Sequence, residues 1–285
     1  MGQVLGAMFS DFGTADDRHI TQSMGQETSE AAQHQASYER IYQTTGLHDD
    51  ARFYEWVLRL IKPRVGSRLL DVACGEGGLL VAASRLPVRV YSVGISYHTL
   101  LKVRAKDSTA DVIIGNTQQL PFPSQSFDSV TCLGSLENFT EPLHALDEIW
   151  RILKPGGVLC IMLPNKFWLG DALQVLFGKE EQQPFQRVER MATVGQWRRL
   201  LQLQGFSVQR MIGYVKCSPL IKEGKLRSVR KFLRSQMLSM LCPVSLAWSV
   251  MYLCQRSSPR QSSQSGAAAW IWRAEWARPG SASLS

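Results

Sequence analysis

Short apolar runs alternate with helical patterns along the middle of the chain. The runs at 69–73, 88–93 and 112–114 are rich in Leu, Val and Ile, and each is followed by a turn or a helical pattern. Parallel sheets covered by helices carry this alternation, because each strand is buried on both faces and a helix returns the chain to the other end of the sheet. The pattern therefore predicts an α/β fold with a parallel sheet.

Two later helices are predicted by apolar residues that recur every three or four positions. The first covers 141–153, is ended by the Pro-Gly-Gly at 155–157, and is followed by a buried strand at 158–163. The second lies around 194–201 and stops at Gly205, a residue suited to a left-handed cap. The alternation of helix and strand thus continues toward the C-terminal third.

The segment LLDVACGEGG, residues 69–78, carries the clearest sign of a ligand. An apolar strand ends there at an acidic residue and enters a glycine-rich turn, and a helix is predicted from 79 to 86. Glycines remove the side chains that would keep a ligand off the backbone, and the N–H groups of a helix N-terminus face the same place. The sequence predicts a ligand site at this turn, with a plain strand-to-helix turn as the alternative.

The spacing of these glycines separates two kinds of nucleotide site. A dinucleotide-binding fingerprint needs a third glycine where this chain has Leu80, which disfavours hydride chemistry on a nicotinamide. The pattern Asp-x-Ala-x-Gly-x-Gly at 71–77 instead resembles the first motif of class I S-adenosylmethionine-dependent methyltransferases, of the type that acts on small molecules. Later motifs of that family are resembled, in the family's order, by the segments 88–106, 114–142 and 145–165.

This resemblance implies a Rossmann-like fold with a seven-stranded, mostly parallel sheet, helices on both faces and an antiparallel last strand. It implies S-adenosylmethionine as the cofactor. No metal is expected, because the scattered cysteines form no metal-site pattern. By the family comparison, Asp71 helps to hold the amino group of the cofactor, while Gly75 and Gly77 lie against its methionine part. The cofactor-binding residues that we expect are Asp71, Ala73, Gly75, Gly77, Gly94, Ile95, Ser96, Asn116, Thr117, Leu133 and Tyr38.

Three positions depart from the family pattern. Ala73 takes the first glycine place, which adds only a methyl group. Gly94 stands where the family usually has an acid that binds both ribose hydroxyls, and Ser92 or Ser96 would be a weaker, neutral acceptor. Asn116 stands where an Asp often accepts from the adenine amino group, and its amide oxygen suits the same contact. We therefore expect cofactor binding about 1–3 kcal/mol weaker than in a typical relative.

Methyl transfer needs placement more than acid–base chemistry, because the sulfonium already makes the methyl group electrophilic. A base helps where the acceptor loses a proton, and Glu137 is the candidate, with simple solvation of its loop as the alternative. Asn138 replaces a histidine found in some relatives, and His144 is expected to be exposed on a helix surface. Tyr38 and Tyr42 would either close the pocket as part of a lid or pack on the core.

Composition agrees with one soluble, cytoplasmic enzyme domain that carries appendages. The 285 residues are 45% hydrophobic, enough for one domain to bury a full core. Six scattered cysteines suggest buried thiols in a reducing compartment, and we expect no secretory signal. We predict a flexible segment at 1–35, the S-adenosylmethionine-binding domain at 36–216 and a disordered tail at 255–285.

Positive charge gathers in the C-terminal third. Residues 187–260 hold 14 Lys and Arg against 2 Asp and Glu, and an uncharged run of eighteen residues, 237–254, follows the most basic stretch. We predict a helical segment at 217–254 that covers the domain or closes over the substrate, with a peripheral membrane contact through 222–254 or a membrane span as alternatives. No nucleic acid is expected, because the basic region lacks interleaved aromatic residues.

The predicted function is S-adenosylmethionine-dependent methyl transfer to a small or lipid-linked metabolite, such as a quinone or sugar precursor, with oxygen as the first candidate for the accepting atom. Residues 166–192 and 217–254 would shape the acceptor pocket. Two alternatives stay open. One is a non-catalytic adaptor that binds the cofactor weakly, favoured by Gly94 and Asn138; the other is an RNA or protein methyltransferase, favoured only by the charge.

Overall fold

The computed structural model divides the chain into two compact units. The first contains the described residues up to Leu133 together with His144–Leu159; the second contains Gly134–Leu143 and the described residues from Cys160 onward. One strand, β5 (Leu153–Pro164), runs from the first unit into the second. The residues that the structure describes are 51–94, 101–104, 111–167, 190–214 and 243–257.

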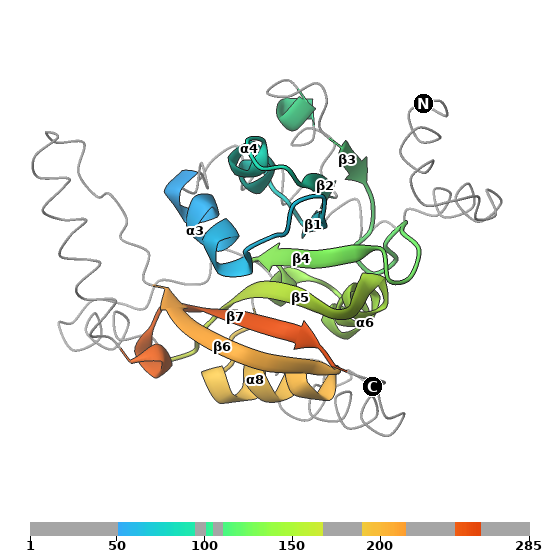
Figure 1. Cartoon of the computed structure of the whole chain (residues 1–285). Coiled ribbons are helices and arrows are strands. Elements are labelled where there is room, and N and C mark those ends of the chain that lie inside the picture. The colour runs from blue at the N-terminus through green and yellow to red at the C-terminus, as the bar shows by residue number, and fades with distance from the viewer. Residues whose placement is uncertain (1–50, 95–100, 105–110, 168–189, 215–242, 258–285) are drawn as a thin grey trace, which may run out of the picture. The chain divides into compact units, whose positions relative to one another are not determined.

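The first unit holds four strands in the order β3-β2-β1-β4 (Figure 1). Strand β1 pairs in parallel with β2 and with β4, and β2 pairs in parallel with β3. The register aligns Val72 with both Val93 and Cys132, and Gly94 with Ile114, so the carboxyl ends of these strands lie at one edge. The strands are β1 (Arg68–Val72), β2 (Arg89–Gly94), β3 (Asp111–Ile114) and β4 (Phe127–Leu133).

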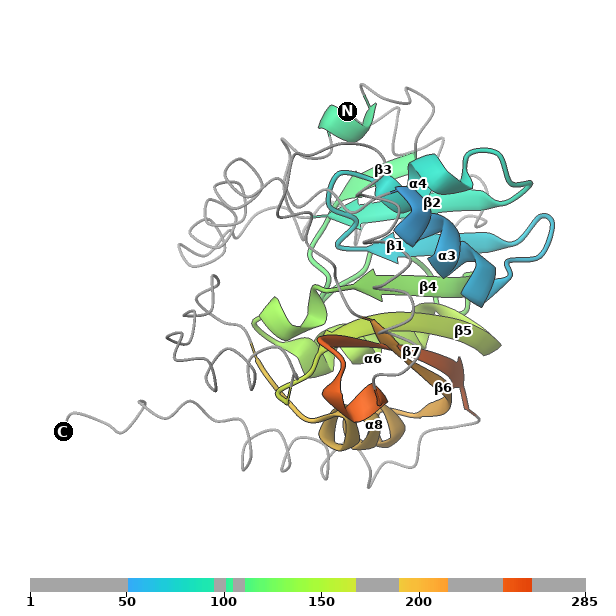
Figure 2. The ribbon, with the colours of Figure 1, turned by 90° about the vertical axis from the view of Figure 1, so that its left-hand side faces the viewer.

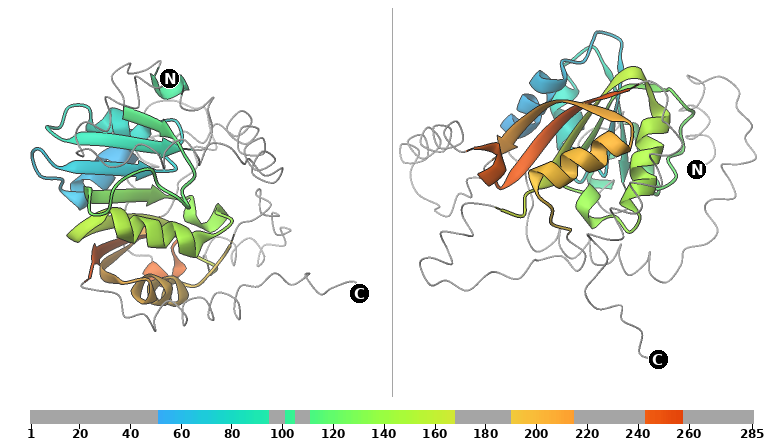
Figure 3. Two further views of the ribbon diagram at one scale, coloured as in Figure 1. Left: turned by 90° about the vertical axis from the view of Figure 1, so that its right-hand side faces the viewer. Right: turned by 90° about the horizontal axis from the view of Figure 1, so that it is seen from below.

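Helices cover both faces of these strands, as the alternating pattern predicts. Helices α3 (Ala51–Ile61) and α4 (Gly78–Ala83) pack against each other, and Figure 2 shows α3 in front of the strands. Helix α6 (Pro142–Ile152) lies on the opposite face in the left view of Figure 3. Leu69, Leu70 and Val72 of β1 are fully buried between these layers.

Helix α4 is shorter than its sequence pattern predicts. It ends at Ala83 instead of residue 86, where the N–H of Leu86 turns back to the carbonyl of Ala83. The Ser84 hydroxyl donates to the carbonyl of Val81 at 2.9 Å. Pro87 follows, and the residue before a proline disfavours the helical conformation. The prediction therefore places the helix correctly and its end three residues too late.

Strand β5 begins at Leu153, directly after α6 and earlier than the predicted start at 158. The Lys-Pro-Gly-Gly segment was expected to be a turn that ends the helix. Instead, it runs alongside the beginning of β4: the Ser126 N–H donates to the carbonyl of Ile152 at 2.7 Å, and Lys154 Nζ lies 2.8 Å from Asp128 Oδ1. Strand β5 continues through Gly156 and Gly157 as the neighbour of β4 in the sheet.

The second unit contains the end of β5 with β7 (Ser249–Arg256) and β6 (Phe206–Tyr214), in the order β5-β7-β6. Strands β6 and β7 are antiparallel. Helix α8 (Val194–Leu203) lies along β6, as the right view of Figure 3 shows. The complete strand order is β3-β2-β1-β4-β5-β7-β6, which confirms the predicted seven-stranded, mostly parallel sheet.

Local signals explain where α8 begins and ends. A capping box closes its first turn: the Gln196 N–H donates to Thr193 Oγ1, and the Thr193 N–H donates to Gln196 Oε1. Its buried face includes Trp197, whose indole N–H donates to the carbonyl of Pro164 at 2.8 Å. Gly205 follows with a φ of +83°, the left-handed cap that the sequence predicts.

The predicted helical C-terminal segment is wrong for its last part. Residues 249–254 belong to β7, which is buried between β5 and β6, so the sheet extends well beyond residue 216. A strand buried on both faces is a continuous apolar run, and periodicity alone does not separate it from a buried helix. Residues 217–242 lie outside the described residues. None of the described helices is long and apolar enough to cross a membrane.

Candidate functional site

The glycine-rich turn begins directly after β1, at the edge where the four parallel strands of the first unit end. Ala73, Gly75 and Gly77 all have a left-handed backbone, with φ values of +57°, +51° and +73°. The Cys74 N–H donates to the carbonyl of Val93 at 3.2 Å, and the Gly77 N–H donates to the carbonyl of Cys74 at 3.0 Å. The turn is therefore closed on itself and tied to β2.

Ala73 carries a backbone cost in addition to its methyl group. A left-handed conformation costs an L-residue with a Cβ about 1–2 kcal/mol, which explains why the family pattern has glycine at this place. The sequence-based view that the departure adds only a methyl group is therefore incomplete.

Two neighbouring elements pack closely against the turn. A Cβ atom on Gly77 would lie 2.8 Å from both methyl groups of Val103, which belongs to the helical residues 101–104. A Cβ atom on Gly78 would overlap the ring of Tyr54 on α3. Both positions therefore exclude side chains, and the contacts fix the path of the backbone that a ligand would meet.

A buried polar row crosses three strands just before the turn. Asp71 is 3% exposed, and the register pairs it with Ser92 on β2 and Thr131 on β4. Thr131 Oγ1 donates to Asp71 Oδ1 at 2.6 Å. Burial raises the pKa of Asp71 from 3.8 to about 7, and the hydrogen bond from Thr131 opposes that rise. A cationic amino group beside this carboxyl would favour its ionised form.

Ser92, one of the neutral acceptors expected for the ribose, is 0% exposed inside the sheet. Its contact with the ribose stays a prediction. Gly94 ends β2 with no side chain to offer, and its carbonyl accepts from the Gly115 N–H at 3.2 Å. Ile95, Ser96 and Tyr38, which we also expected to contact the cofactor, lie outside the described residues.

The loop after β3 presents Asn116. This residue is exposed, and its Oδ1 accepts from the Gln118 N–H at 2.9 Å while its backbone carbonyl accepts from the Gln119 N–H at 3.1 Å. The side-chain bond orients the amide, and an amide oxygen has two lone pairs, so it still has capacity for a second donor. Thr117 beside it is half-buried, as is Leu133 at the end of β4.

An ion pair joins the turn to the helical residues that follow β2. Lys102 Nζ lies 3.2 Å from Glu76 Oε1, and the Glu76 side chain is only partly exposed. Glu76 is the residue between the second and third positions of the glycine pattern. The pair therefore adds a polar contact to the apolar packing of Val103 against Gly77.

The candidate base lies in the second unit. Glu137 belongs to the short 3₁₀ turn Leu136–Asn138 and is only 6% exposed, so its side chain is not simply solvated at the loop surface. Arg190 fastens this loop: its guanidinium donates to the carbonyls of Glu137, Phe139 and Thr140, and its backbone N–H donates to the carbonyl of Glu137 at 3.2 Å. The role of Glu137 as a base stays a prediction. His144 is exposed on α6, as expected.

Sequence reasoning missed several residues that build these places. Thr131 was missed because the pairing register decides which residue of β4 lies opposite Asp71, and Val72 pairs with Cys132, one residue before the end of β4. Tyr54 and Arg190 were missed because their contacts join segments that are 24 and about 50 residues apart and have no motif of their own.

Comparisons with known proteins agree with this geometry. Residues 70–161 match the model of the family described as "Methyltransferase domain". Residues 70–161 of this chain therefore form a methyltransferase domain. Domains of this kind take S-adenosylmethionine as the cofactor. The matched residues of the domain include the turn, β2, β3, β4, α6 and most of β5.

Named relatives match the same domain. A demethylmenaquinone methyltransferase of Listeria monocytogenes is 33% identical over 134 residues, which are 44% of this chain and 56% of that protein. A chloroplastic 2-methyl-6-phytyl-1,4-hydroquinone methyltransferase of rice is 34% identical over 124 residues, 40% of this chain and 36% of its own length. The chain thus spans about half or less of the length of these relatives.

A solved structure supports the fold beyond the matched residues. An S-adenosylmethionine-dependent methyltransferase of Thermotoga maritima aligns with a TM-score of 0.54 over 77% of this chain and 95% of that one, at 18% identity. At this identity the likeness establishes the fold of the methyltransferase domain and does not extend to its substrate.

Proposed function

We propose that this chain transfers a methyl group from S-adenosylmethionine to a small-molecule or lipid-linked acceptor. The observation that carries the proposal is the turn at 73–78, where left-handed glycines leave the backbone bare next to the buried carboxyl of Asp71. When bound, the cofactor supplies a methyl group on a positively charged sulfur. The protein contributes placement and the exclusion of water.

Each described part of the turn suits one part of this cofactor. Asp71 would pair with the amino group, and Gly75 and Gly77 would let the amino-acid end approach the backbone. The Asn116 amide oxygen would accept from the adenine amino group, with Thr117 and Leu133 beside it. Donors and acceptors of these types fit the cofactor's polar groups, apart from the ribose hydroxyls next to Gly94.

For the acceptor we propose a quinone-type ring. The support is that two relatives are named for methyl transfer to demethylmenaquinone and to a phytyl hydroquinone. Oxygen is the accepting atom that we predict, with Glu137 as the base or as a contact to the acceptor. Most of the residues in the segments expected to shape the pocket, 166–192 and 217–254, lie outside the described residues, as do most of those in the proposed membrane contact at 222–254. A cytoplasmic location remains a prediction.

Labelling tests both the reaction and the acceptor. The chain is incubated with methyl-labelled S-adenosylmethionine and either a short-chain demethylmenaquinol or a total lipid extract, and mass spectrometry identifies the labelled product and atom. We expect label in a quinone-type product. Gly77→Arg, which fills the turn against Val103, should abolish the label. Undiminished label in that variant would refute the proposed cofactor site.

A second candidate function is supported by Gly94. If the lost ribose contact weakens cofactor binding far enough, the chain would act as a weakly binding, non-catalytic adaptor. Calorimetric titration with S-adenosylhomocysteine separates the two. Sub-micromolar affinity would argue against the adaptor, and binding weaker than about 1 mM together with no labelled product would favour it.

A further inference from the structure

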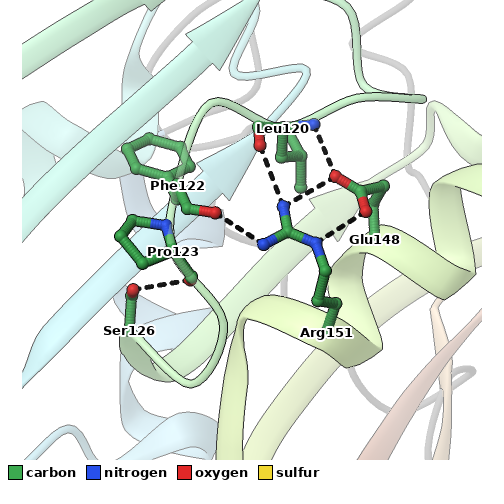
Figure 4. A network of polar contacts seen from close by, with 6 residues as sticks. All are labelled: Leu120, Phe122, Pro123, Ser126, Glu148 and Arg151. Carbon is green, nitrogen blue, oxygen red and sulfur yellow. Dashed lines mark hydrogen bonds and ion pairs between the residues drawn. The ribbon is translucent and has the colours of Figure 1, made fainter. Parts of the chain in front are cut away.

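A guanidinium on α6 holds the loop that joins β3 to β4 (Figure 4). Arg151 Nη1 donates to the carbonyl of Phe122 at 2.7 Å, and Nη2 donates to the carbonyl of Leu120 at 3.0 Å. The same group forms a two-pronged pair with Glu148, with Nε–Oε1 and Nη2–Oε2 distances of 2.7 and 2.8 Å. Glu148 Oε2 in turn accepts from the Leu120 N–H at 2.8 Å.

Both polar groups of the Leu120 backbone are therefore fixed by one ion pair. The carbonyl faces Arg151 and the N–H faces Glu148, so the pair grips the peptide chain from two sides. An ion pair that bonded only to itself would not hold the loop. Here three nitrogens of the guanidinium donate to four oxygens, two of Glu148 and two backbone carbonyl oxygens of the loop. Lysine lacks the planar, forked arrangement of donors that this requires.

Further bonds continue this anchorage toward β4. The Gln125 N–H donates to the carbonyl of Arg151 at 2.9 Å, and Ser126 Oγ donates to the carbonyl of Pro123 at 2.7 Å. At the other end of the loop, the Gly115 N–H is tied to the carbonyl of Gly94. Residues 116–119 therefore lie between two backbone positions that hydrogen bonds hold, Gly115 and Leu120. They include Asn116, the proposed adenine contact.

We propose that the Glu148–Arg151 pair is a positioning device for adenine recognition, which sets the place of Asn116 by holding Leu120. The inference rests on the proposed function, because it assigns the pair a task in binding the cofactor. Neither side chain touches the cofactor in this scheme. Both act through the backbone of the loop, so they are positioning residues and not catalytic ones.

The pair also contributes to folding, because its side chains are only 34% and 19% exposed and a two-pronged arginine–carboxylate pair is the geometry in which an ion pair can stabilise a fold. In addition, the pair fixes the position of the loop. A shift of the loop by a fraction of a hydrogen-bond length would misplace the Asn116 amide oxygen, because hydrogen bonds weaken steeply with poor geometry.

The first unit also offers a matched control. Lys154 Nζ and Asp128 Oδ1 form another ion pair, 2.8 Å long, with side chains that are 42% and 37% exposed. Asp128 lies near the beginning of β4, at the end of the strand away from the carboxyl edge. Loss of this more exposed pair, which has a single contact, removes an ion pair of the same unit without touching Leu120 or Phe122.

The experiment compares two ligands by calorimetry. S-adenosylhomocysteine carries the adenine amino group, and S-inosylhomocysteine has oxygen in its place. We expect the wild type to prefer the former by about tenfold, the equivalent of one hydrogen bond. Asn116→Ala should erase the preference. Arg151→Lys should weaken binding of S-adenosylhomocysteine by about tenfold and reduce the preference to within about twofold, while Lys154→Gln leaves both affinities within about twofold.

The preference ratio separates a positioning role from a structural one. If Arg151→Lys weakens both ligands equally, or leaves both unchanged, the positioning role is wrong while the proposed function stands. If the wild type binds neither ligand, the proposed function fails and this inference fails with it. Thermal unfolding of each variant accompanies the titrations. Should Arg151→Lys not fold, Glu148→Gln tests the same grip, because the amide keeps only one acceptor oxygen and its NH2 group, a donor, faces a guanidinium N–H.

Discussion

Thr131 donates a 2.6 Å hydrogen bond to the carboxyl of Asp71 across the parallel pair β1 and β4. Both side chains are buried, at 0% and 3% exposure. The hydrogen bond favours the charged carboxylate, whereas burial favours the neutral acid, and burial is the larger effect because the pKa rises to about 7. A carboxyl that titrates near neutral pH therefore lies directly before the proposed cofactor turn.

Cofactor binding should depend on pH through Asp71. Because the cofactor's ammonium group pairs with the ionised carboxylate, binding below a pH of about 7 must first remove a proton from the acid. The dissociation constant of S-adenosylhomocysteine should fall by up to about tenfold per pH unit as the pH rises to 7 and then level off. Titrations from pH 5.5 to 8.5 measure this. Asp71→Asn should bind weakly at every pH, and a wild type without pH dependence would exclude the pairing.

Thr131→Val tests the hydrogen bond separately. Valine keeps the shape of the side chain and removes the donor, so the pKa of Asp71 should rise further and binding at pH 7 should weaken by about 3- to 10-fold. The pH at which binding levels off should move upward. Thr131→Ser keeps the hydroxyl and should restore both values. Equal binding by the valine and serine variants would show that the bond does not influence the carboxyl.

Asp71 should also make the stability of the ligand-free protein pH-dependent. Its pKa is about 7 when folded and near 3.8 when exposed, so between these values the folded state holds a proton that the unfolded state has lost. The stabilisation is complete below pH 4 and is lost as the pH rises through 7. Asp71→Asn should therefore be more stable than the wild type at pH 8, by roughly 1–4 kcal/mol, and closer to it at pH 5. Urea unfolding at the two pH values measures the difference, and an equal gap at both would contradict it.

Ala73→Gly should stabilise the protein. The left-handed backbone at Ala73 costs about 1–2 kcal/mol, which glycine would avoid. Glycine has more conformational freedom in the unfolded chain, and this reduces the gain in stability by about 0.5–1 kcal/mol. The net gain in the free energy of unfolding should be about 1 kcal/mol. Ala83→Gly in the last position of α4 is the control, because there glycine should destabilise by about 1 kcal/mol. The same sign for both variants would refute the assigned strain.

Gly94→Asp should restore the ribose contact that the family pattern contains. A carboxylate at the end of β2 would accept from the ribose hydroxyls, so binding of S-adenosylhomocysteine should tighten by about 1–3 kcal/mol, or about 5- to 150-fold. Gly94→Asn offers a neutral acceptor of similar size and should gain less. If neither variant binds more tightly than the wild type, the weak point of the cofactor site lies elsewhere.

The sequence predicted the strands of the first unit well, because runs such as 69–73 are short, apolar and followed by turn residues. It misjudged residues 249–254, where an uncharged buried run reads equally well as a helix or a strand and only its pairing with β6 decides. The strain at Ala73 was invisible, since a backbone angle leaves no trace in composition. The contacts of Arg190 and Arg151 were equally hidden, because backbone carbonyls of distant segments accept their bonds.

The most direct test of the central claim is a crystal structure of the chain with S-adenosylhomocysteine. We predict that its amino-acid end lies against Cys74–Gly78, with the amino group next to Asp71 and the adenine beside Asn116. Density at another edge of the sheet, or a turn at 74–78 that stays empty at saturating ligand, would contradict the account.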